Sequence, residues 1–310
     1  MKLIFRTVLA ALLFSQAGCV LRQAAVEPPV AAKGVLDLRQ WNGPRDGPVP
    51  LNGDWEWYWK RFVPPAQFAK GLAARPDAYL AVPGVWNEHV LGPMLQRGMG
   101  HATYRLRVLV SSRSPLSLKF LTAATASVFY IDGQRIGGGG SIGTAARTSQ
   151  PGYRPFTVTF TPRSDTVELV AHVSNFHYRK GGLWNIIELG TPAQIDQVRL
   201  RKISRDYFLA GSFLLIGLYH LFIWLFLRQR LPVLFGAFCL LVVVRILTTG
   251  EHAIQVWWSW PWTAVIHAEL LSFFLMVPVF TAFSHQAFPD ETSPLMSRFF
   301  IVAGVLFSAL

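Results

Sequence analysis

The segment FLAGSFLLIGLYHLFIWLFL, residues Phe208–Leu227, carries no formally charged side chain. An α-helix rises about 1.5 Å per residue, so a segment of this length spans a bilayer core of about 30 Å. The residues before it alternate polar and apolar side chains, and those after it form further apolar runs separated by short polar loops. The sequence therefore predicts a folded polar domain followed by a bundle of membrane helices.

The composition agrees with this division. Of the 310 residues, 52% are hydrophobic, which is more than is usual for a water-soluble domain. The formal net charge is +12 at pH 7, and most of the basic excess precedes residue 206. This charge indicates either a generally basic surface or an anionic partner such as an acidic sugar, a phosphorylated compound or a lipid headgroup. No nucleic-acid-binding motif and no cofactor motif is present, and the two cysteines, Cys19 and Cys239, predict neither a disulfide framework nor a metal site.

The N-terminus has the layout of a bacterial signal peptide. Residues 1–18, MKLIFRTVLAALLFSQAG, begin with basic residues, continue with a short apolar core and end with small residues. We therefore expect the domain that follows to be exported. The sequence QAGC at Gln16–Cys19 also resembles a lipobox, in which Cys19 would be lipidated, although Gln16 stands where that motif prefers leucine.

Residues 35–200 contain short runs of alternating polar and apolar residues, which is the pattern of half-buried strands. The clearest runs are Thr103–Val110, Leu116–Leu121, Ala126–Ile131, Phe156–Phe160 and Val167–Val173. Asp132-Gly133 supplies the residues that a tight hairpin turn requires. Gly137–Gly140 lacks the Lys-Ser/Thr ending of a phosphate-binding loop and is expected in a hairpin or loop. Because no long amphipathic helix interrupts the runs, we predict an antiparallel β-sandwich.

Several phrases resemble the galactose-binding-like jelly roll that precedes the catalytic barrel of β-galactosidases and β-glucuronidases. They are Leu51–Trp55, Val82–Asn87, Ala102–Arg105 and Phe129–Gly133. Such a hydrolase would next require a barrel with paired carboxylates, whereas this chain enters the membrane region. The visible residues form no catalytic constellation, so the resemblance implies a binding module.

A second resemblance covers the chain from about Val35 onward. The phrases that carry it are Val173–Thr191 (VSNFHYRKGGLWNIIELGT), Leu36–Trp41 (LDLRQW) and Arg245–His252 (RILTTGEH). Together they resemble the bacterial seven-transmembrane (7TM) receptors with diverse intracellular signalling modules. The resemblance implies an extracytoplasmic jelly-roll sensor, seven helices and a C-terminal output domain: a histidine kinase, diguanylate cyclase, nucleotide cyclase or phosphatase. No output domain follows here, so a C-terminally truncated fragment is expected.

Ligand-binding candidates within the sandwich are aromatic, amide and basic side chains, because aromatic faces stack on sugar rings and Arg or Asn fixes hydroxyl and carboxylate groups. They are Trp86, Asn87, Asn175, His177, Arg179, Lys180, Trp184 and Asn185. Alternation places Trp55, Trp57 and Trp59 on one strand face, where core packing is the simpler interpretation. The segment 177–182 is interpreted as a ligand loop, a contact with the bundle or a plain turn.

The membrane region is predicted to begin with a juxtamembrane helix over residues 193–206, started by the Thr191-Pro192 cap. This helix is expected to continue into the first span without a break. The predicted spans, which form the N-terminal part of a 7TM bundle over residues 208–310, are 208–227, 231–248, 262–283 and an incomplete 299–310.

Arg245 and Glu269 lie within apolar segments, where an unpaired charge is costly. We predict that they pair near the outer ends of the second and third spans, as a switch contact, as part of a ligand cavity or as a structural pin; the other interpretation is that each side chain extends to the membrane interface. Glu251, His252 and His267 fall at the same level and suggest an outer polar cluster, but their spacing matches no metal motif.

The topology follows from the loops. The loop Thr249–Pro261 has no Lys or Arg and contains three tryptophans, which suits the outer face of a bacterial inner membrane. We therefore expect the sandwich in the periplasm and Arg228–Arg230 in the cytoplasm. The predicted function is a signalling receptor for a small carbohydrate-like or anionic ligand. Membrane lipid and a second copy of the chain, through the bundle, are further expected partners. The alternative is a transporter, or a transport-associated protein, with a substrate-capturing sandwich.

Overall fold

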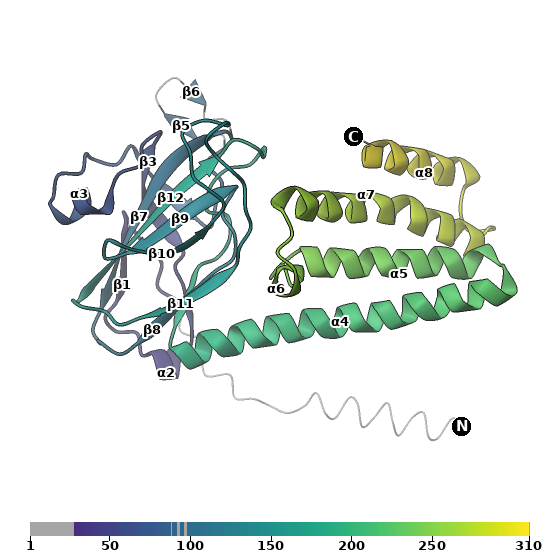
Figure 1. Ribbon diagram of the computed structural model, residues 1–310, viewed down its shortest axis with the longest axis horizontal. Coiled ribbons are helices and arrows are strands. Elements are labelled where there is room, and N and C mark those ends of the chain that lie inside the picture. Colours follow the sequence, from purple (N-terminus) through teal and green to yellow (C-terminus); the bar gives the residue numbers. More distant parts are fainter. Residues whose placement is uncertain (1–27, 88, 92–93, 96–97, 310) are drawn as a thin grey trace.

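The computed structural model describes residues 28–87, 89–91, 94–95 and 98–309 (Figure 1). The predicted signal peptide and Cys19 lie outside these residues. A β-sandwich occupies one end of the molecule and four long helices extend from it. The predicted fold class, an all-β sandwich followed by a helical membrane region, is confirmed.

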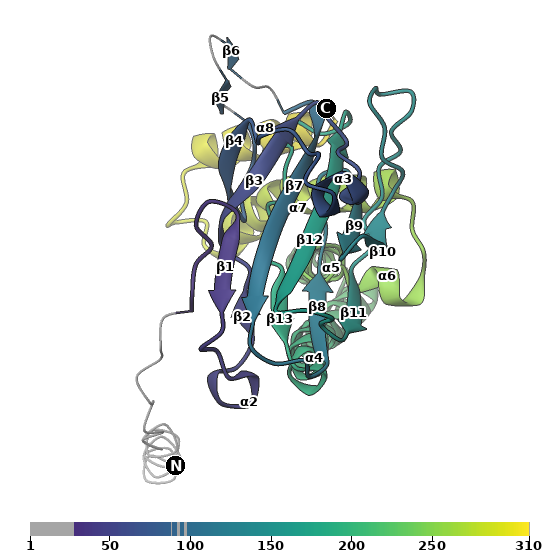
Figure 2. The same cartoon turned by 90° about the vertical axis from the view of Figure 1, so that its left-hand side faces the viewer.

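The larger sheet has the strand order β10-β9-β12-β7-β3-β4, and β1 pairs in parallel with β7 (Figure 2). Its strands are β1 (Val35–Leu38), β3 (Gly53–Trp59), β4 (Ala78–Val82), β7 (Gly100–Val110), β9 (Ala126–Ile131), β10 (Gln134–Gly139) and β12 (Thr166–Asn175). The smaller sheet has the order β11-β8-β13-β2. Its strands are β2 (Val49–Pro50), β8 (Leu116–Phe120), β11 (Phe156–Phe160) and β13 (Glu188–Gly190). A separate pair consists of β5 (Val90–Leu91) and β6 (Met94–Leu95), and two short helices are α2 (Gly43–Asp46) and α3 (Pro65–Ala69).

The hairpin between β9 and β10 turns at Asp132-Gly133. Gln134 stands opposite Ile131, so two residues make the connection. Both have positive φ, +46° and +80°, which is the conformation that a type I′ turn needs and that Asp-Gly supplies at low cost.

The core between the sheets contains the side chains of Trp55, Trp57 and Trp86, all fully buried. Trp59 is half-buried against the same cluster. The alternate face of β3 is also covered, because Tyr58 packs with Phe68 of α3. The tryptophans of the WEWYW run thus fill the core.

The helical region consists of α4 (Pro192–Leu227), α5 (Arg230–Thr248), the short α6 (Ile254–Trp257), α7 (Trp262–Ala287) and α8 (Pro294–Ala309). The Thr191 side chain accepts a hydrogen bond from the Gln194 amide, and the Gln194 side chain accepts one from the Thr191 amide. This capping box begins a helix of 36 residues, which contains both the predicted juxtamembrane helix and the first span.

Three helices of the described chain, α4, α5 and α7, are long and apolar enough to cross a membrane. α7 continues to Ala287, four residues beyond the predicted span, and α8 begins at Pro294, five residues before the predicted one. The four long helices run alternately away from the sandwich and back toward it (Figure 1). The loop between α5 and α7 therefore lies on the same side as the sandwich.

Candidate functional site at the junction of sandwich and helices

The smaller sheet meets the helical region at the first half of α4 and at the loop that joins α5 to α7. Strands β8 and β13 both contact α4. Tyr207 of α4 also donates its hydroxyl proton to the carbonyl of Ala253, at 3.2 Å. Three segments far apart in the sequence thus come together at one place.

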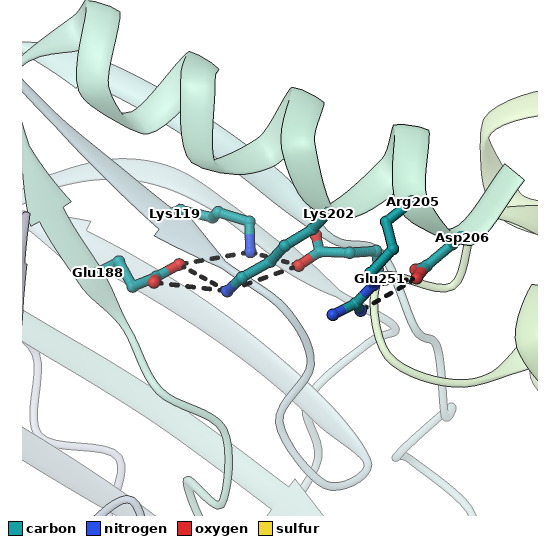
Figure 3. Close-up of polar contacts among 6 residues, drawn as sticks. All are labelled: Lys119, Glu188, Lys202, Arg205, Asp206 and Glu251. Carbon is teal, nitrogen blue, oxygen red and sulfur yellow. Dashed lines mark hydrogen bonds and ion pairs between the residues drawn. The ribbon is translucent and has the colours of Figure 1, made fainter. Parts of the chain in front are cut away.

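Four side chains form a charge network at this junction (Figure 3). Lys119 Nζ lies 2.7 Å from Glu251 Oε1 and 3.5 Å from Glu188 Oε2. Lys202 Nζ lies 3.2 Å from Glu188 Oε2 and 3.9 Å from Glu251 Oε1. Each cation therefore contacts both carboxylates. The network joins β8, β13, α4 and the α5–α7 loop.

The fold explains how these four side chains meet. Lys119 and Glu188 are partners in the antiparallel register of β8 and β13, so their side chains leave the same face of the sheet. Lys202 follows ten residues after Pro192, which places it about 15 Å along α4. Glu251 lies three residues after the end of α5, and its side chain is 7% exposed. In the adjacent turn of α4, the buried Asp206 pairs with Arg205 at 3.1 Å (Figure 3).

A cavity of about 580 Å³ lies beside this network, and we call it the junction cavity. Its walls come from the β8 end, the segment 152–157, α4 and the α5–α7 loop. The polar and aromatic residues that line it are Lys119, Phe120, Tyr153, Arg154, Phe156, Thr157, Arg199, Glu251, His252, Gln255, Ser259 and Trp260.

His252 is the most unusual residue of the cavity wall. It is 7% exposed, has positive φ (+48°), and its Nδ1 has no hydrogen-bond partner among the residues that the structure describes. Burial lowers the pKa of His252 to about 4, against a smaller opposing effect of a hydrogen bond to the Thr248 backbone. Its ring lies 5.2 Å from that of Tyr153, and burial raises the pKa of this tyrosine to about 12. His252 is therefore neutral at pH 7.

The sequence-predicted ligand residues lie elsewhere, around the loops at 86–87 and 175–185. Trp86 is buried, and its indole donates to the Gly98 carbonyl at 3.0 Å. Asn87 donates to the Arg179 carbonyl at 2.7 Å and accepts from the Gly181 amide at 2.9 Å. The structure thus brings these loops together. The side chains of Trp86 and Asn87 are hydrogen-bonded to backbone groups of neighbouring segments and hold the loops in place.

Two further asparagines of this group are engaged in the same way. Asn175 is fully buried, and its Nδ2 lies within hydrogen-bond distance of the carbonyls of Gly98, Tyr178 and Lys180, at 2.8, 2.6 and 3.0 Å. Asn185 donates to the Thr122 carbonyl at 2.9 Å.

The remaining candidates differ in exposure. His177, Arg179 and Lys180 are exposed, and Trp184 is half-buried against the ring of Tyr178. A ligand-binding role for the whole set stays a prediction.

Within the bundle, Arg245 and Glu269 lie close together. Arg245 Nη1 is 3.7 Å from Glu269 Oε1 and donates to the Glu269 carbonyl at 2.9 Å. The Arg245 guanidinium also stands 5.2 Å from the ring centre of Phe273. His267 bonds to the Thr263 carbonyl of its own helix.

Sequence reasoning placed Glu251 and His252 in an outer polar cluster but missed their partners on the sandwich. Lys119 stands in the run LSLKF, where alternation gives it no special status. Lys202 is one of several basic residues before the first span. The one local signal in the sequence was Glu251, an acidic residue in a loop that has no Lys or Arg.

Comparison with known proteins finds a family that the helical region resembles. Residues 205–310 match the model of the family described as 7TM diverse intracellular signalling. The helical region is thus similar to this family. The charge network connects the β-sandwich to the first helix and to the α5–α7 loop of this region. No curated protein matches the chain.

Solved structures similar to the chain include glycoside hydrolases, over 46% of its length. A GH2 β-galacturonidase from Eisenbergiella tayi bound to galacturonate has 15% identity and a TM-score of 0.34, with 24% of that enzyme covered. A β-glucuronidase from Ruminococcus gnavus has 14% identity and a TM-score of 0.33, with 28% covered. A β-glucuronidase from an uncultured Clostridium sp. has 17% identity and a TM-score of 0.33, also with 28% covered. The chain thus spans about a quarter of the length of these enzymes.

Proposed function

We propose that this chain is a transmembrane signalling receptor. Its sandwich senses a small carbohydrate-like or anionic ligand outside the cytoplasm, and its helices relay binding to an output module inside. The observation that carries the proposal is the charge network, in which the sandwich cation Lys119 pairs with Glu251 of the helical region at 2.7 Å. The match of residues 205–310 to the 7TM signalling family supports the same conclusion.

The coupling would run through two elements. α4 is one continuous helix from Pro192 to Leu227. A displacement of its first turns at the sandwich would therefore also move its membrane-spanning part. The α5–α7 loop, held by Glu251 and by the Tyr207–Ala253 hydrogen bond, connects the sandwich to two more helices. A ligand shifts such an equilibrium only if it binds one arrangement more tightly than the other.

The proposed location is the bacterial inner membrane, with the sandwich in the periplasm. Trp257, Trp258 and Trp260 are 70%, 63% and 40% exposed at the sandwich end of the bundle, which suits a membrane interface. Arg228 and Arg230 lie at the opposite end, where positive charge favours the cytoplasm. Alkaline phosphatase, which is active only outside the cytoplasm, provides the test. A fusion after Gln255 should be active and a fusion after Arg230 inactive; the reverse pattern contradicts this orientation.

The receptor function is tested on the whole chain in lipid nanodiscs. Spin labels at Gln229 and Asp290, in the two loops at the end away from the sandwich, report the arrangement of the helices. A sugar or organic acid that raises the unfolding temperature should also change the distance distribution between the labels. In the Lys119→Met variant the distance change should shrink even at ligand concentrations that saturate the protein. Binding without any distance change in the wild type, together with uptake into proteoliposomes, would instead favour the transporter.

A further inference from the structure

The junction cavity has the features of a binding site. We propose that it binds a small hydroxylated anion, one that carries a carboxylate or phosphate beside a hydroxyl group, with Arg154, Arg199 and His252 as its contacts. This inference rests on the proposed receptor function and deepens it, because it places the ligand at the junction and not at the loops 86–87 and 175–185.

The position of the cavity is the first argument. Its wall includes Phe156 and Thr157 at the start of β11, Arg199 and Ile203 of α4, and six loop residues between Glu251 and Trp260. A ligand at this place touches the sandwich, the first helix and the α5–α7 loop at once. Its binding energy therefore depends directly on how these three parts are arranged, which is the differential affinity that a receptor requires.

Charge is the second argument. Among the lining residues, the basic side chains are Lys119, Arg154 and Arg199, and the one acidic side chain is that of Glu251. Lys119 and Glu251 pair with each other, so the two arginines leave an excess of positive charge. Both arginines are exposed and can reach a bound molecule. Guanidinium groups bind carboxylate and phosphate by paired hydrogen bonds.

His252 supplies the third and most specific argument. Its ring is almost fully buried on the cavity wall, and Nδ1 lacks a partner among the described residues. A neutral imidazole has one nitrogen that donates and one that accepts, so Nδ1 can exchange a hydrogen bond with a hydroxyl group in either tautomer. Such a hydroxyl would lie next to the anion held by the arginines.

Two sources can provide this chemistry: a free sugar acid or sugar phosphate, and the headgroup of an anionic phospholipid such as phosphatidylglycerol. The experiment separates them. The whole chain is placed in phosphatidylcholine nanodiscs and titrated calorimetrically with glucuronate and with glucose 6-phosphate, and uncharged glucose serves as the matched control ligand. In parallel, the unfolding temperature is compared between pure phosphatidylcholine and phosphatidylcholine–phosphatidylglycerol nanodiscs.

Four variants locate the site. Arg154→Gln and Arg199→Gln should each weaken binding of the charged probes at least tenfold, because each removes a charge-assisted contact. Arg201→Gln, two residues along the same helix and outside the cavity wall, should change binding less than twofold. His252→Asn should weaken binding at least tenfold while keeping the backbone, since asparagine tolerates positive φ. Selective stabilisation by phosphatidylglycerol that is lost in Arg199→Gln, without binding of the free probes, supports the site with a lipid as its source.

The contrary results are equally specific. If neither charged probe binds more tightly than glucose and phosphatidylglycerol has no selective effect, the cavity holds only water and the inference fails. If Arg179→Gln abolishes binding and Arg199→Gln does not, the ligand occupies the sandwich loops, so this inference fails while the receptor function stands. If the cavity variants abolish binding but the wild-type label distances never respond to the ligand, the site is established and the signalling function is not.

Discussion

Lys119 and Glu251 lie 132 positions apart in the sequence, yet their Nζ and Oε1 atoms are 2.7 Å apart and their side chains are only 3% and 7% exposed. Placing two charges away from water is costly, so such a pair adds little net stability, whereas removing one partner leaves an unpaired buried charge. The pair therefore favours one docking geometry of sandwich and helices over others.

Loss of the Lys119 charge should destabilise the junction. Lys119→Met leaves Glu251 with only the more distant Lys202, at 3.9 Å, and we expect a cost of about 3 kcal/mol in unfolding free energy. Thermal unfolding in detergent measures the loss, and hydrogen exchange should show it at β8 and at the α5–α7 loop. Lys70→Met, at an exposed position of the sandwich, is the matched control. The double variant Lys119→Met/Glu251→Met should recover much of the loss. If Lys119→Met and Glu251→Met, each made alone, are as stable as the wild type, the two side chains do not form a buried ion pair.

Asn175 should act through stability and not through ligand contact. Asn175→Ala removes the amide from three carbonyls around the loop 175–180, and buried polar groups left without partners cost about 1–3 kcal/mol. We expect a lower unfolding temperature in the absence of any ligand. Arg179→Ala, exposed in the same loop, should leave the unfolding temperature unchanged. If Asn175→Ala proves as stable as Arg179→Ala, the amide is available for a ligand after all.

Close packing of α4 and α5 depends on two glycines. A Cβ at Gly217 would lie 3.2 Å from the Gly236 carbonyl oxygen and 3.3 Å from the Cys239 Cβ. Gly217→Val should therefore force the helices apart at a cost of about 1–3 kcal/mol. At Gly211 of the same helix a Cβ meets nothing within 4 Å, so Gly211→Val is the control. Thermal unfolding of the detergent-solubilised chain compares the two, and an equal effect of both substitutions would show that α4 and α5 do not approach this closely.

His252 should make stability depend on pH in a defined direction. The pKa of His252 is lowered to about 4 from the ordinary 6.5, so between pH 6.5 and 4 the unfolded chain binds a proton that the folded chain does not. Stability is therefore lost as pH falls through this window, by up to about 3 kcal/mol from this residue, and is unaffected above it. His101 and His172 have pKa values lowered in the same direction, so the informative quantity is a difference. Unfolding free energies at pH 7.5 and 5.0 should fall less for His252→Asn than for the wild type; identical losses would mean that His252 is not buried in the neutral form.

The local pattern of the sequence was sufficient for most of the fold. The β9–β10 turn needs only Asp132-Gly133, which adopt positive φ readily, and the start of α4 needs only the cap formed by Thr191 with Gln194. Each of these features depends on residues within a few positions of one another. For the same reason the alternation of WEWYW was enough to predict a core position for Trp55 and Trp57.

The candidate site was predicted less well, because its residues are distant in sequence. Asn175 and Asn87 have the side chains of ligand-binding residues, and nothing local shows that carbonyls from other loops already occupy them. In the sequence, Lys119 has the pattern of an ordinary outward-facing strand residue. Only the structure shows that the register with β13 places Glu188 beside it and that the α5–α7 loop places Glu251 next to it.

By itself, the sequence determined the class of each segment: strands by a period of two, membrane helices by length and hydropathy, turns by the residues that tolerate their φ angles. Only the tertiary structure decided that a strand of the sandwich, the first half of α4 and the α5–α7 loop enclose a cavity, and that His252 lines it with an Nδ1 atom that has no hydrogen-bond partner among the described residues. The physical reason is that burial and pairing of charges depend on which segments meet in space. Covalent neighbours do not specify that.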